Sequence, residues 1–320
     1  MENISSIKNE NEVINEDELF HFVELDETKS EHLSKEPYSY MKAVFRSFIK
    51  KPAAIIGIIS FIVLILGIII IPQFAYDGAY KHDISNINAS ISRAHLWGTD
   101  RIGRDLFFST WKAAGYSLWL ATISAIINLI IGILLGLVWG FFKKIDWLFI
   151  EIYNLISNIP SMLLYMLLST IFIQAGSLPI EIRLIFTLTL TGWLGIARFV
   201  RNQTIIINDR EYNIASKTLG TPARRMMTKN LLPYIMAVIV TSSMTLIPNM
   251  ISSEVSLSYF GLGLPSDSVS LGALLDLGRR DFLQYPLPLL APGILLALII
   301  FTFFLIGIAL SDALDPKTHR

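Results

Sequence analysis

The sequence predicts an all-α protein that crosses a membrane six times. Of its 320 residues, 53% are hydrophobic and only 16% are charged, and the mean hydropathy is +0.55. A soluble domain has about 25% charged residues. Six apolar stretches are each long enough to cross a hydrocarbon core of about 30 Å, which takes about 20 helical residues. The composition therefore indicates a polytopic membrane protein.

Polar segments of unequal length separate the six expected spans. The spans cover residues 53–74, 116–142, 147–173, 182–200, 234–257 and 287–310. Pro160, Pro248 and Pro292 fall inside three of them. Each proline predicts a kink, which a membrane bundle tolerates because neighbouring groups can bond the freed carbonyls.

Glycine recurs at every fourth residue of the second span, at Gly132, Gly136 and Gly140. Residues at this spacing share one face of a helix. A stripe of small residues lets two helix backbones approach closely inside a membrane. We therefore expect this face to pack against another helix, either in the same bundle or in a partner subunit.

The chain before the first span has two parts. Residues 1–36 hold 11 of the 26 acidic residues and 3 of the 26 basic residues, so we expect an acidic cytoplasmic tail without a packed core. Residues 37–52 are expected to form a helix in the membrane interface, with one apolar and one basic face. The first apolar run lies too far behind this tail to be a signal peptide. The membrane domain is then residues 53–320.

The distribution of Lys and Arg predicts the orientation, because these residues favour the cytoplasmic side. With the N-terminus inside, the inner segments from Tyr38 onward hold 15 basic residues and the outer segments hold 8. Both termini are therefore expected in the cytoplasm. The same arrangement places residues 75–111 and 258–286 outside.

A polar segment interrupts the apolar sequence between the fourth and fifth spans, at residues 209–233. It predicts two short helices with a break between them. Gly220 can adopt a positive φ and end the first helix. Thr221 is expected to cap the second helix, about Ala223 to Leu231, and Pro222 to be its first residue. A basic helical hairpin between two spans must lie in water, where it can contact a partner.

Several classes of chemistry find no support in the sequence. There is no cysteine, which excludes disulfides, thiolate metal sites and a cysteine nucleophile. No phosphate-binding loop and no H-E-x-x-H pattern occurs, and no two histidines have the spacing of metal ligands. The expected spans contain only Glu151 and Glu254 as acidic residues, fewer than is usual for an ion-coupled carrier. We therefore expect no catalytic or metal site, and energy supplied by a partner.

Four stretches of the sequence together resemble one family. They are HLWGTDRIGRDLF at 95–107, REYNIASKTLG at 210–220, SSEVSLSYFGLGLP at 252–265 and GIALSDALDP at 307–316. In this order they resemble the permease subunits of ABC importers for oligopeptides and dipeptides, of the OppC/AmiD type. The acidic tail followed by Tyr38-Ser39-Tyr40 is similar to that of Gram-positive oligopeptide permeases. The resemblance implies the type I ABC importer permease fold.

The second stretch resembles the EAA loop of importer permeases, with two departures. The glutamate of the EAA triplet aligns with Ile214, and Asn230 stands three residues before Pro233 where many relatives have a branched apolar residue. Glu211, which peptide-type members often keep, is present. In the family this loop docks in a groove of a cytosolic ATPase.

The resemblance implies roles for three sets of residues. The expected ATPase contacts are Glu211, Ala215, Leu219, Gly220, Arg224 and Arg225, with Met226 as a further apolar contact. The expected contacts to an extracellular binding protein, or ion pairs of an outer gate, are Asp100, Arg101, Arg104 and Asp105; the alternative is a solvated elbow that orients the second span. The expected lining of a water-filled peptide path is Asn158, Ser161, Asn249, Ser253 and Glu254, some of which could instead bond neighbouring helices.

The resemblance predicts a permease subunit of an ATP-driven oligopeptide importer in the bacterial cell membrane. Its expected partners are a second homologous permease, two cytosolic ABC ATPases, an extracellular binding protein, a peptide and membrane lipid, and no nucleic acid. ATP and Mg²⁺ are expected on the ATPases and no cofactor on this chain. One alternative is a related permease for dipeptides, nickel or glutathione. Another, from a different class, is a membrane scaffold subunit that transports nothing.

Overall fold

A computed structural model of the chain describes residues 40–174, 178–265 and 268–314. The expected acidic tail at residues 1–36 and the last six residues lie outside the described part. All regular elements in the described ranges are helical, as the sequence predicts. The chain divides into two units, residues 1–43 and 44–320, and the second unit holds the membrane bundle. The helix α2 (Tyr40–Ile49) covers much of the expected interfacial segment.

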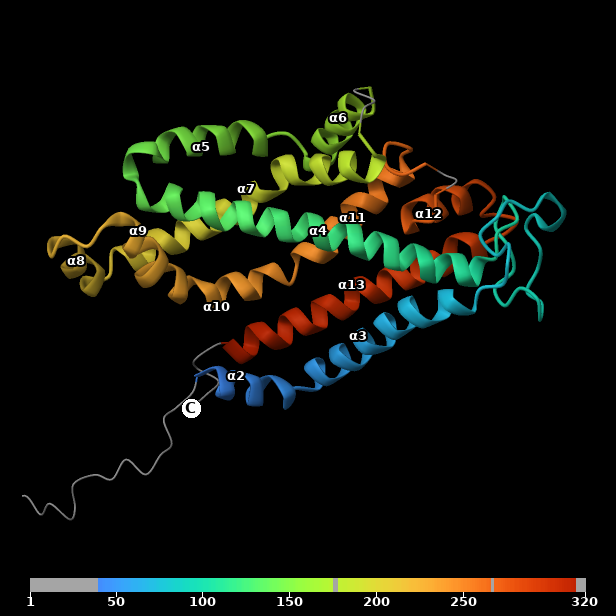
Figure 1. The fold of residues 1–320 in the computed structure, drawn as a ribbon, viewed down its shortest axis with the longest axis horizontal. Helices are drawn as coiled ribbons and strands as arrows, with labels where there is room; N and C mark the ends of the chain where they lie inside the picture. Colours follow the sequence, from blue (N-terminus) through green and yellow to red (C-terminus); the bar gives the residue numbers. More distant parts are fainter. Residues whose placement is uncertain (1–39, 175–177, 266–267, 315–320) are drawn as a thin grey trace, which may run out of the picture. The chain divides into compact units, whose positions relative to one another are not determined.

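Figure 1 labels the helices of the bundle along the chain. In order they are α3 (Pro52–Ile70), η2 (Ile71–Phe74), η3 (Ile84–Asn86), α4 (Leu106–Phe141), α5 (Lys143–Ser157), α6 (Ser161–Gln174), α7 (Ile180–Asn208), α8 (Glu211–Thr218), α9 (Ala223–Arg225), η4 (Met226–Leu231), α10 (Leu232–Ser243), α11 (Leu246–Tyr259), α12 (Leu271–Arg280) and α13 (Leu287–Leu314).

Four helical segments among the described residues are long and apolar enough to cross a membrane. They are Pro52–Phe74, Leu106–Phe141, Ile180–Asn208 and Leu287–Leu314. Two bent pairs raise the number to six if each pair counts as one span. Helices α5 and α6 meet at 86°, and the segments 223–236 and 239–259 meet at 63°. The third and fifth expected spans are therefore broken rather than simply kinked.

Proline accounts for the break between α5 and α6 and for the gap between α10 and α11, whereas the 63° bend falls between Met236 and Ile239, inside α10. Pro160 follows the end of α5, and a proline disfavours the helical conformation of the residue before it. Pro248 lies four residues after Met244, whose carbonyl its ring would meet in a continuous helix, and α10 ends just before Met244. Pro292 leaves α13 continuous. The prolines predict kinks in three spans, but two of the spans break.

The glycine stripe of α4 packs directly on α7. A Cβ on Gly136 would lie 2.6 Å from the carbonyl oxygen of Ala197 and 2.7 Å from the Cβ of Val200. Gly132 and Gly140 meet the neighbouring turns of α7 at similarly short distances. The predicted close packing is confirmed, and its partner is a helix of the same bundle.

Replacing Gly136 with alanine is expected to reduce the stability of the bundle. The methyl group would force α4 and α7 apart, and overpacking of this kind costs about 1–3 kcal/mol. Thermal unfolding in detergent would measure the loss. Gly195→Ala is the matched control, because no atom lies within 4 Å of the position its added methyl would take and both residues are helical. Equal unfolding temperatures for the two variants would contradict the packing described above.

Helices α3 and α13 form a second packed pair. The rings of Phe61 and Phe303 lie edge to face with centroids 5.8 Å apart, and the hydroxyls of Ser60 and Thr302 are 2.6 Å apart. At one end of this pair, Lys51 donates to Asp312 at 2.9 Å. The start of α3 and the end of α13 therefore lie together.

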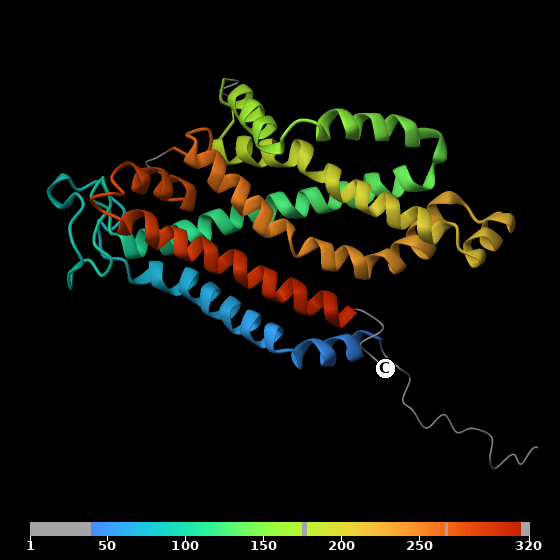
Figure 2. The same cartoon turned by 180° about the vertical axis from the view of Figure 1, so that it is seen from behind.

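Two polar structures occupy opposite ends of the bundle (Figures 1 and 2). One is the elbow, residues 75–105, which leads into the start of α4. The other is the hairpin, residues 209–233, which contains α8, α9 and η4. Because α4 runs from the elbow toward the hairpin, the bundle can link the two structures mechanically.

Candidate functional site

The hairpin turns at Gly220 as predicted. Gly220 has a φ of +80°, and its N–H donates to the carbonyl of Lys217 at 3.0 Å. The N–H of Thr221 donates to the carbonyl of Ser216 at 3.2 Å. These two bonds form a Schellman motif, which ends α8. Glycine is needed here because other residues rarely adopt this φ.

The second half of the hairpin differs from the prediction in two ways. Pro222, not Thr221, is the N-cap of α9, and the Thr221 hydroxyl instead lies 2.9 Å from that of Ser216. The helix is also not a regular α-helix ending at Leu231. After three residues it becomes the π-helix η4 and continues into α10 without a gap. A displacement of the hairpin can therefore pass directly to α10.

The hairpin exposes all six residues predicted to contact an ATPase. These are Glu211, Ala215, Leu219, Gly220, Arg224 and Arg225. Leu219 stands at the tip with 87% of its surface exposed. Ile214, which replaces the family glutamate, is also exposed. Met226 is fully buried, so its prediction as an apolar contact is wrong. It lies on the inner face of the helical segment whose outer face carries Arg225 and Lys229.

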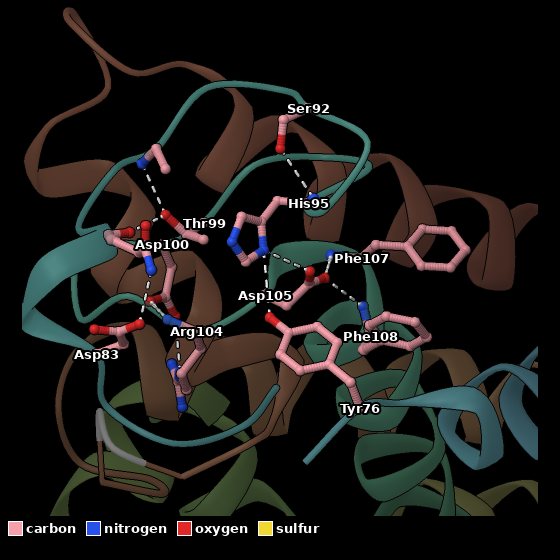
Figure 3. A network of polar contacts seen from close by, with 12 residues as sticks. Tyr76, Asp83, Ser92, His95, Thr99, Asp100, Arg104, Asp105, Phe107 and Phe108 are labelled. Atoms are coloured by element: carbon pink, nitrogen blue, oxygen red, sulfur yellow. Dashed lines mark hydrogen bonds and ion pairs between the residues drawn. The ribbon is translucent and has the colours of Figure 1, made fainter. Parts of the chain in front are cut away.

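The elbow is organised around the carboxylate of Asp100 (Figure 3). Its Oδ1 accepts from the backbone N–H groups of Ile102 and Arg104 at 3.0 and 2.9 Å. Its Oδ2 accepts from Nε of Arg104 at 2.8 Å, and both side chains are buried. Arg104 also donates from Nη1 to the carbonyl of Ser268 at 3.0 Å. The ion pair thus ties the elbow to the segment between α11 and α12.

Asp105 fixes the start of α4. Its Oδ1 accepts from the N–H groups of Phe107 and Phe108, as an N-cap residue does. Its Oδ2 lies 3.0 Å from Nδ1 of His95, and Nδ1 lies 3.3 Å from the Tyr76 hydroxyl (Figure 3). Burial and the nearby Asp105 carboxylate raise the pKa of the Tyr76 phenol. The phenol therefore stays neutral and can bond within this network.

Two positive-φ glycines close the elbow. Gly98 and Gly103 have φ values of +75° and +82°. A Cβ on Gly103 would lie 1.9 Å from the carbonyl oxygen of Asp83, so the backbones are in direct contact there. The stretch from His95 to Asp105 therefore builds a compact turn with a buried polar centre, held by the side chains of Asp100, Arg104 and Asp105.

Burial corrects the prediction for the elbow charges. Asp100, Arg104 and Asp105 are buried, so they are neither solvated nor available to contact a docking protein. The other expected role, ion pairs of an outer gate, stays a prediction, and the buried pair of Asp100 and Arg104 is compatible with it. Their charges are satisfied inside the chain, which is the usual condition for burying an ionised side chain. Arg101 alone of the four is exposed, with its Nε 3.5 Å from Oδ2 of Asp281.

A cavity of about 580 Å³ lies between helices α4, α6, α7, α10 and α11. Its polar lining residues are Ser161, Ser242, Ser243, Thr245, Asn249, Ser252 and Ser253. Three predicted path residues therefore line one cavity: Asn249 and Ser253 lie one turn apart on α11, and Ser161 comes from the distant helix α6. The cavity offers hydroxyl and amide groups and no charged side chain among the described residues.

Two predicted path residues do not line this cavity. Glu254 is buried, and its Oε1 accepts from the Ser258 hydroxyl at 3.0 Å, one helical turn away on the same helix. Its neighbours Ser252 and Ser253 face the cavity, and a helix turns about 100° per residue, so Glu254 faces elsewhere. Asn158 caps the C-terminus of α5 and is exposed.

Sequence reasoning missed part of the cavity lining. Ser242, Ser243 and Thr245 belong to a short run of hydroxyl residues inside an otherwise apolar stretch, and this run was the available signal. Gly192 and Gly195 also line the cavity, and a Cβ on Gly195 would meet no atom within 4 Å; no local sequence pattern indicates such positions. Within residues 40–174, 178–265 and 268–314, no three histidine, aspartate or glutamate side chains gather as they would around a metal ion.

Two family patterns match the sequence. The family described as the binding-protein-dependent transport system inner membrane component matches residues 128–320. The N-terminal transmembrane domain of oligopeptide transport permease C matches residues 39–90. The first match covers the broken spans, the hairpin and the cavity, and the second covers α3 and part of the elbow.

Whole-chain comparisons agree with these matches. The chain is 38% identical over 310 residues to the oligopeptide transport system permease protein AmiD of Streptococcus pneumoniae, covering 95% of this chain and 98% of that protein. It is 32% identical to OppC of Bacillus subtilis, covering 91% and 94%, and 31% identical to the dipeptide permease DppC of the same organism, covering 95% and 94%. The chain therefore belongs to the ABC importer permease subunits of the oligopeptide and dipeptide family, the inner-membrane components of binding-protein-dependent transport systems.

Proposed function

We propose that this chain forms half of the transmembrane path of an ATP-driven importer of oligopeptides. The similarity to proteins named oligopeptide transport permeases carries this proposal, because it extends over more than nine-tenths of the chain. The uncharged polar cavity is compatible with it. Hydroxyl and amide groups can bond a peptide backbone whatever its side chains are, so a path built from them suits varied peptides.

Dipeptides are the second candidate substrate, since a dipeptide permease is similar over the same length. Peptide uptake by cells that depend on this chain would distinguish oligopeptides from dipeptides as the substrate. Oligopeptide import predicts that radiolabelled peptides of four or five residues enter and compete with shorter ones. If only dipeptides enter, the second candidate replaces the first.

The proposed assembly contains a second homologous permease, two cytosolic ABC ATPases and an extracellular binding protein. ATP and Mg²⁺ are bound by the ATPases, and this chain catalyses no reaction. The excess of Lys and Arg on one side orients both termini and the hairpin toward the cytoplasm. The elbow then faces outward, toward the binding protein, and Arg101 is the one of the four predicted contact residues that is exposed.

In this assembly the hairpin transmits the work of ATP binding. Closure of the two ATPases would move both hairpins, and the permease halves would rock from an inward-facing to an outward-facing state. A peptide would enter from the binding protein and leave on the cytoplasmic side. ATP acts here by favouring one of two conformations, since it binds one state of the ATPases better than the other.

The exposed tip of the hairpin provides the test of this proposal. Leu219→Asp is expected to abolish co-purification of the ATPases, because it places a charge in the apolar centre of the interface. The fold should not change, since Leu219 is 87% exposed. Affinity capture through a tag on this chain, followed by mass spectrometry, would measure the ATPases retained.

Leu283→Asp is the matched control for this test. Leu283 is 99% exposed and lies between α12 and α13, at the elbow end of the bundle. The same charge change there should leave ATPase capture intact. If Leu219→Asp also retains both ATPases, the hairpin is not the docking site. If the unaltered chain captures none, the membrane scaffold alternative gains support.

A further inference from the structure

A buried asparagine joins the hairpin to α7. Asn213 lies in the first turns of α8 and is fully buried. Its Nδ2 donates to the carbonyl of Ile207, in the last turn of α7, at 2.8 Å. This carbonyl also accepts from the N–H of Arg210 at 3.2 Å. The Asn213 bond is therefore an additional tie across the corner between α7 and α8.

A second asparagine reaches the same point from the other half of the hairpin. Nδ2 of Asn230, in η4, donates to Oδ1 of Asn213 at 3.3 Å and lies 3.4 Å from the Ser216 hydroxyl. The Ser216 hydroxyl in turn lies 2.9 Å from that of Thr221 in the turn. A continuous polar chain thus runs from the end of α7, through α8, to both the turn and η4.

The π-helix explains how Asn230 comes to face α8. In an α-helix, the ring of Pro233 would clash with the carbonyl of Lys229. In η4 the turn is wider, and the N–H of Leu232 donates to the carbonyl of Met227, five residues earlier. Single π-turns of this kind occur often at functional sites. Here the widened turn keeps Leu231 buried while Asn230 contacts α8.

We propose that Asn213 and Asn230 form a clasp that makes the hairpin one rigid unit with the ends of α7 and α10. The inference rests on the proposed role of the hairpin in ATPase coupling and names the residues that transmit its movement. Asn230 is then a positioning residue, which contacts neither ATPase nor peptide. Rigid coupling is required because an exposed tip that flexes on its own would move without moving the spans.

Other contacts of α8 are weaker ties than the clasp. The Lys217 ammonium lies 5.6 Å from the ring centroid of Phe141 on α4, and the rings of Tyr212 and Tyr234 are 6.0 Å apart. Lys217 and Tyr212 are exposed, where such contacts contribute little. Asn213 is buried, so its carbonyl oxygen depends on the donor that Asn230 supplies.

Spin labelling of the purified chain tests the clasp without any partner. The sequence has no cysteine, so labels can be placed by two substitutions alone, Leu219→Cys at the tip and Ile206→Cys on the exposed side of α7. Double electron-electron resonance spectroscopy then gives the distribution of distances between the two spin labels. Asn230→Leu is expected to broaden this distribution. Asn202→Leu, the same change at an exposed position of α7, should leave it narrow.

A double variant separates a clasp from ordinary packing. In Asn213→Leu/Asn230→Leu no buried amide is left unsatisfied, so thermal stability should return toward that of the unaltered chain. Both the bond from Asn213 to Ile207 and the bond from Asn230 to Asn213 are absent in this variant, so the distance distribution should stay broad. If the distribution becomes narrow again in the double variant, or never broadens in Asn230→Leu, the clasp is wrong.

The complete transporter gives the functional readout. With radiolabelled trialanine as the probe, Asn230→Leu is expected to reduce the uptake per ATP hydrolysed about fivefold or more. ATPase capture should stay at its normal level, because the exposed docking residues are unchanged. Normal uptake per ATP together with a broadened distribution would overturn the coupling role. Failure of the Leu219→Asp test would instead overturn the proposed docking role of the hairpin and leave the labelling result valid.

Discussion

Gly103→Ala is expected to unfold the elbow. The added methyl would lie 1.9 Å from the carbonyl oxygen of Asp83, which is a backbone atom and cannot move by a change of rotamer. Asp83 is also held there, because its N–H donates to the carbonyl of Ile102 at 3.0 Å. Separating these segments would expose the buried pair of Asp100 and Arg104. We expect a loss of about 4–5 kcal/mol, at the upper end for one substitution.

Gly78→Ala is the matched control within the same elbow. Gly78 also has a positive φ, +102°, but nothing lies within 4 Å of the position of its added methyl. The control should therefore show only the cost of the unfavourable backbone conformation, about 1–2 kcal/mol. The unfolding temperatures of the two purified variants in detergent would give the comparison.

Chemical labelling of a cysteine at a buried position tests this prediction even if the Gly103→Ala variant is too unstable for an unfolding measurement. Ser109, in the first turn of α4, is fully buried. A cysteine introduced there should react with a membrane-impermeant maleimide only when the elbow opens. Rapid labelling is expected in the Gly103→Ala background and slow labelling in the Gly78→Ala background. Similar labelling rates in the two backgrounds would show that the backbone contact does not hold the elbow.

The sequence predicts the long helices of this fold well, because a single strong pattern encodes them. Apolar runs of about 20 residues leave few structures other than a membrane helix. The turn at Gly220 is equally local, since a glycine followed shortly by proline indicates where one helix ends and another begins. Where one physical effect dominates over a few adjacent residues, prediction and structure agree.

The buried charges of the elbow could not be predicted in the same way. Charged residues in a loop are expected in water, and the partners of Arg104 are not visible locally. Its Nη1 bonds the carbonyl of Ser268, 164 residues later in the chain. Burial of the pair depends on how distant segments close over it. The same limit applies to Glu254, whose direction depends on the exact rotation of α11 relative to the cavity.

The helix breaks are only partly predictable from the sequence. Pro160 and Pro248 are recognisable in the sequence as disruptive, but a proline can kink a helix or end it. Neighbouring residues decide between the two outcomes through tertiary contacts. Pro292 lies inside α13, past its first turn, and that helix nevertheless remains continuous.

Gly220→Pro is expected to separate ATP hydrolysis from transport while the protein stays in the membrane. Proline fixes φ near −65°, whereas Gly220 has a φ of +80°. It also lacks the N–H that bonds the carbonyl of Lys217. The Schellman motif would be lost, and α8 and Leu219 would point in a new direction. We expect peptide uptake to fall about tenfold or more, which corresponds to about 1.4 kcal/mol of lost coupling.

Gly220→Asn provides the control at the same residue, since asparagine tolerates the left-handed conformation and keeps the N–H. It should retain most of the uptake. No atom lies within 4 Å of the added Cβ at this position, so any difference between the two variants reflects the backbone and not a steric clash. Uptake and ATP hydrolysis measured in the same proteoliposomes would give the ratio. Normal uptake by Gly220→Pro would mean that the direction of α8 does not matter for coupling, because this change cannot leave that direction intact.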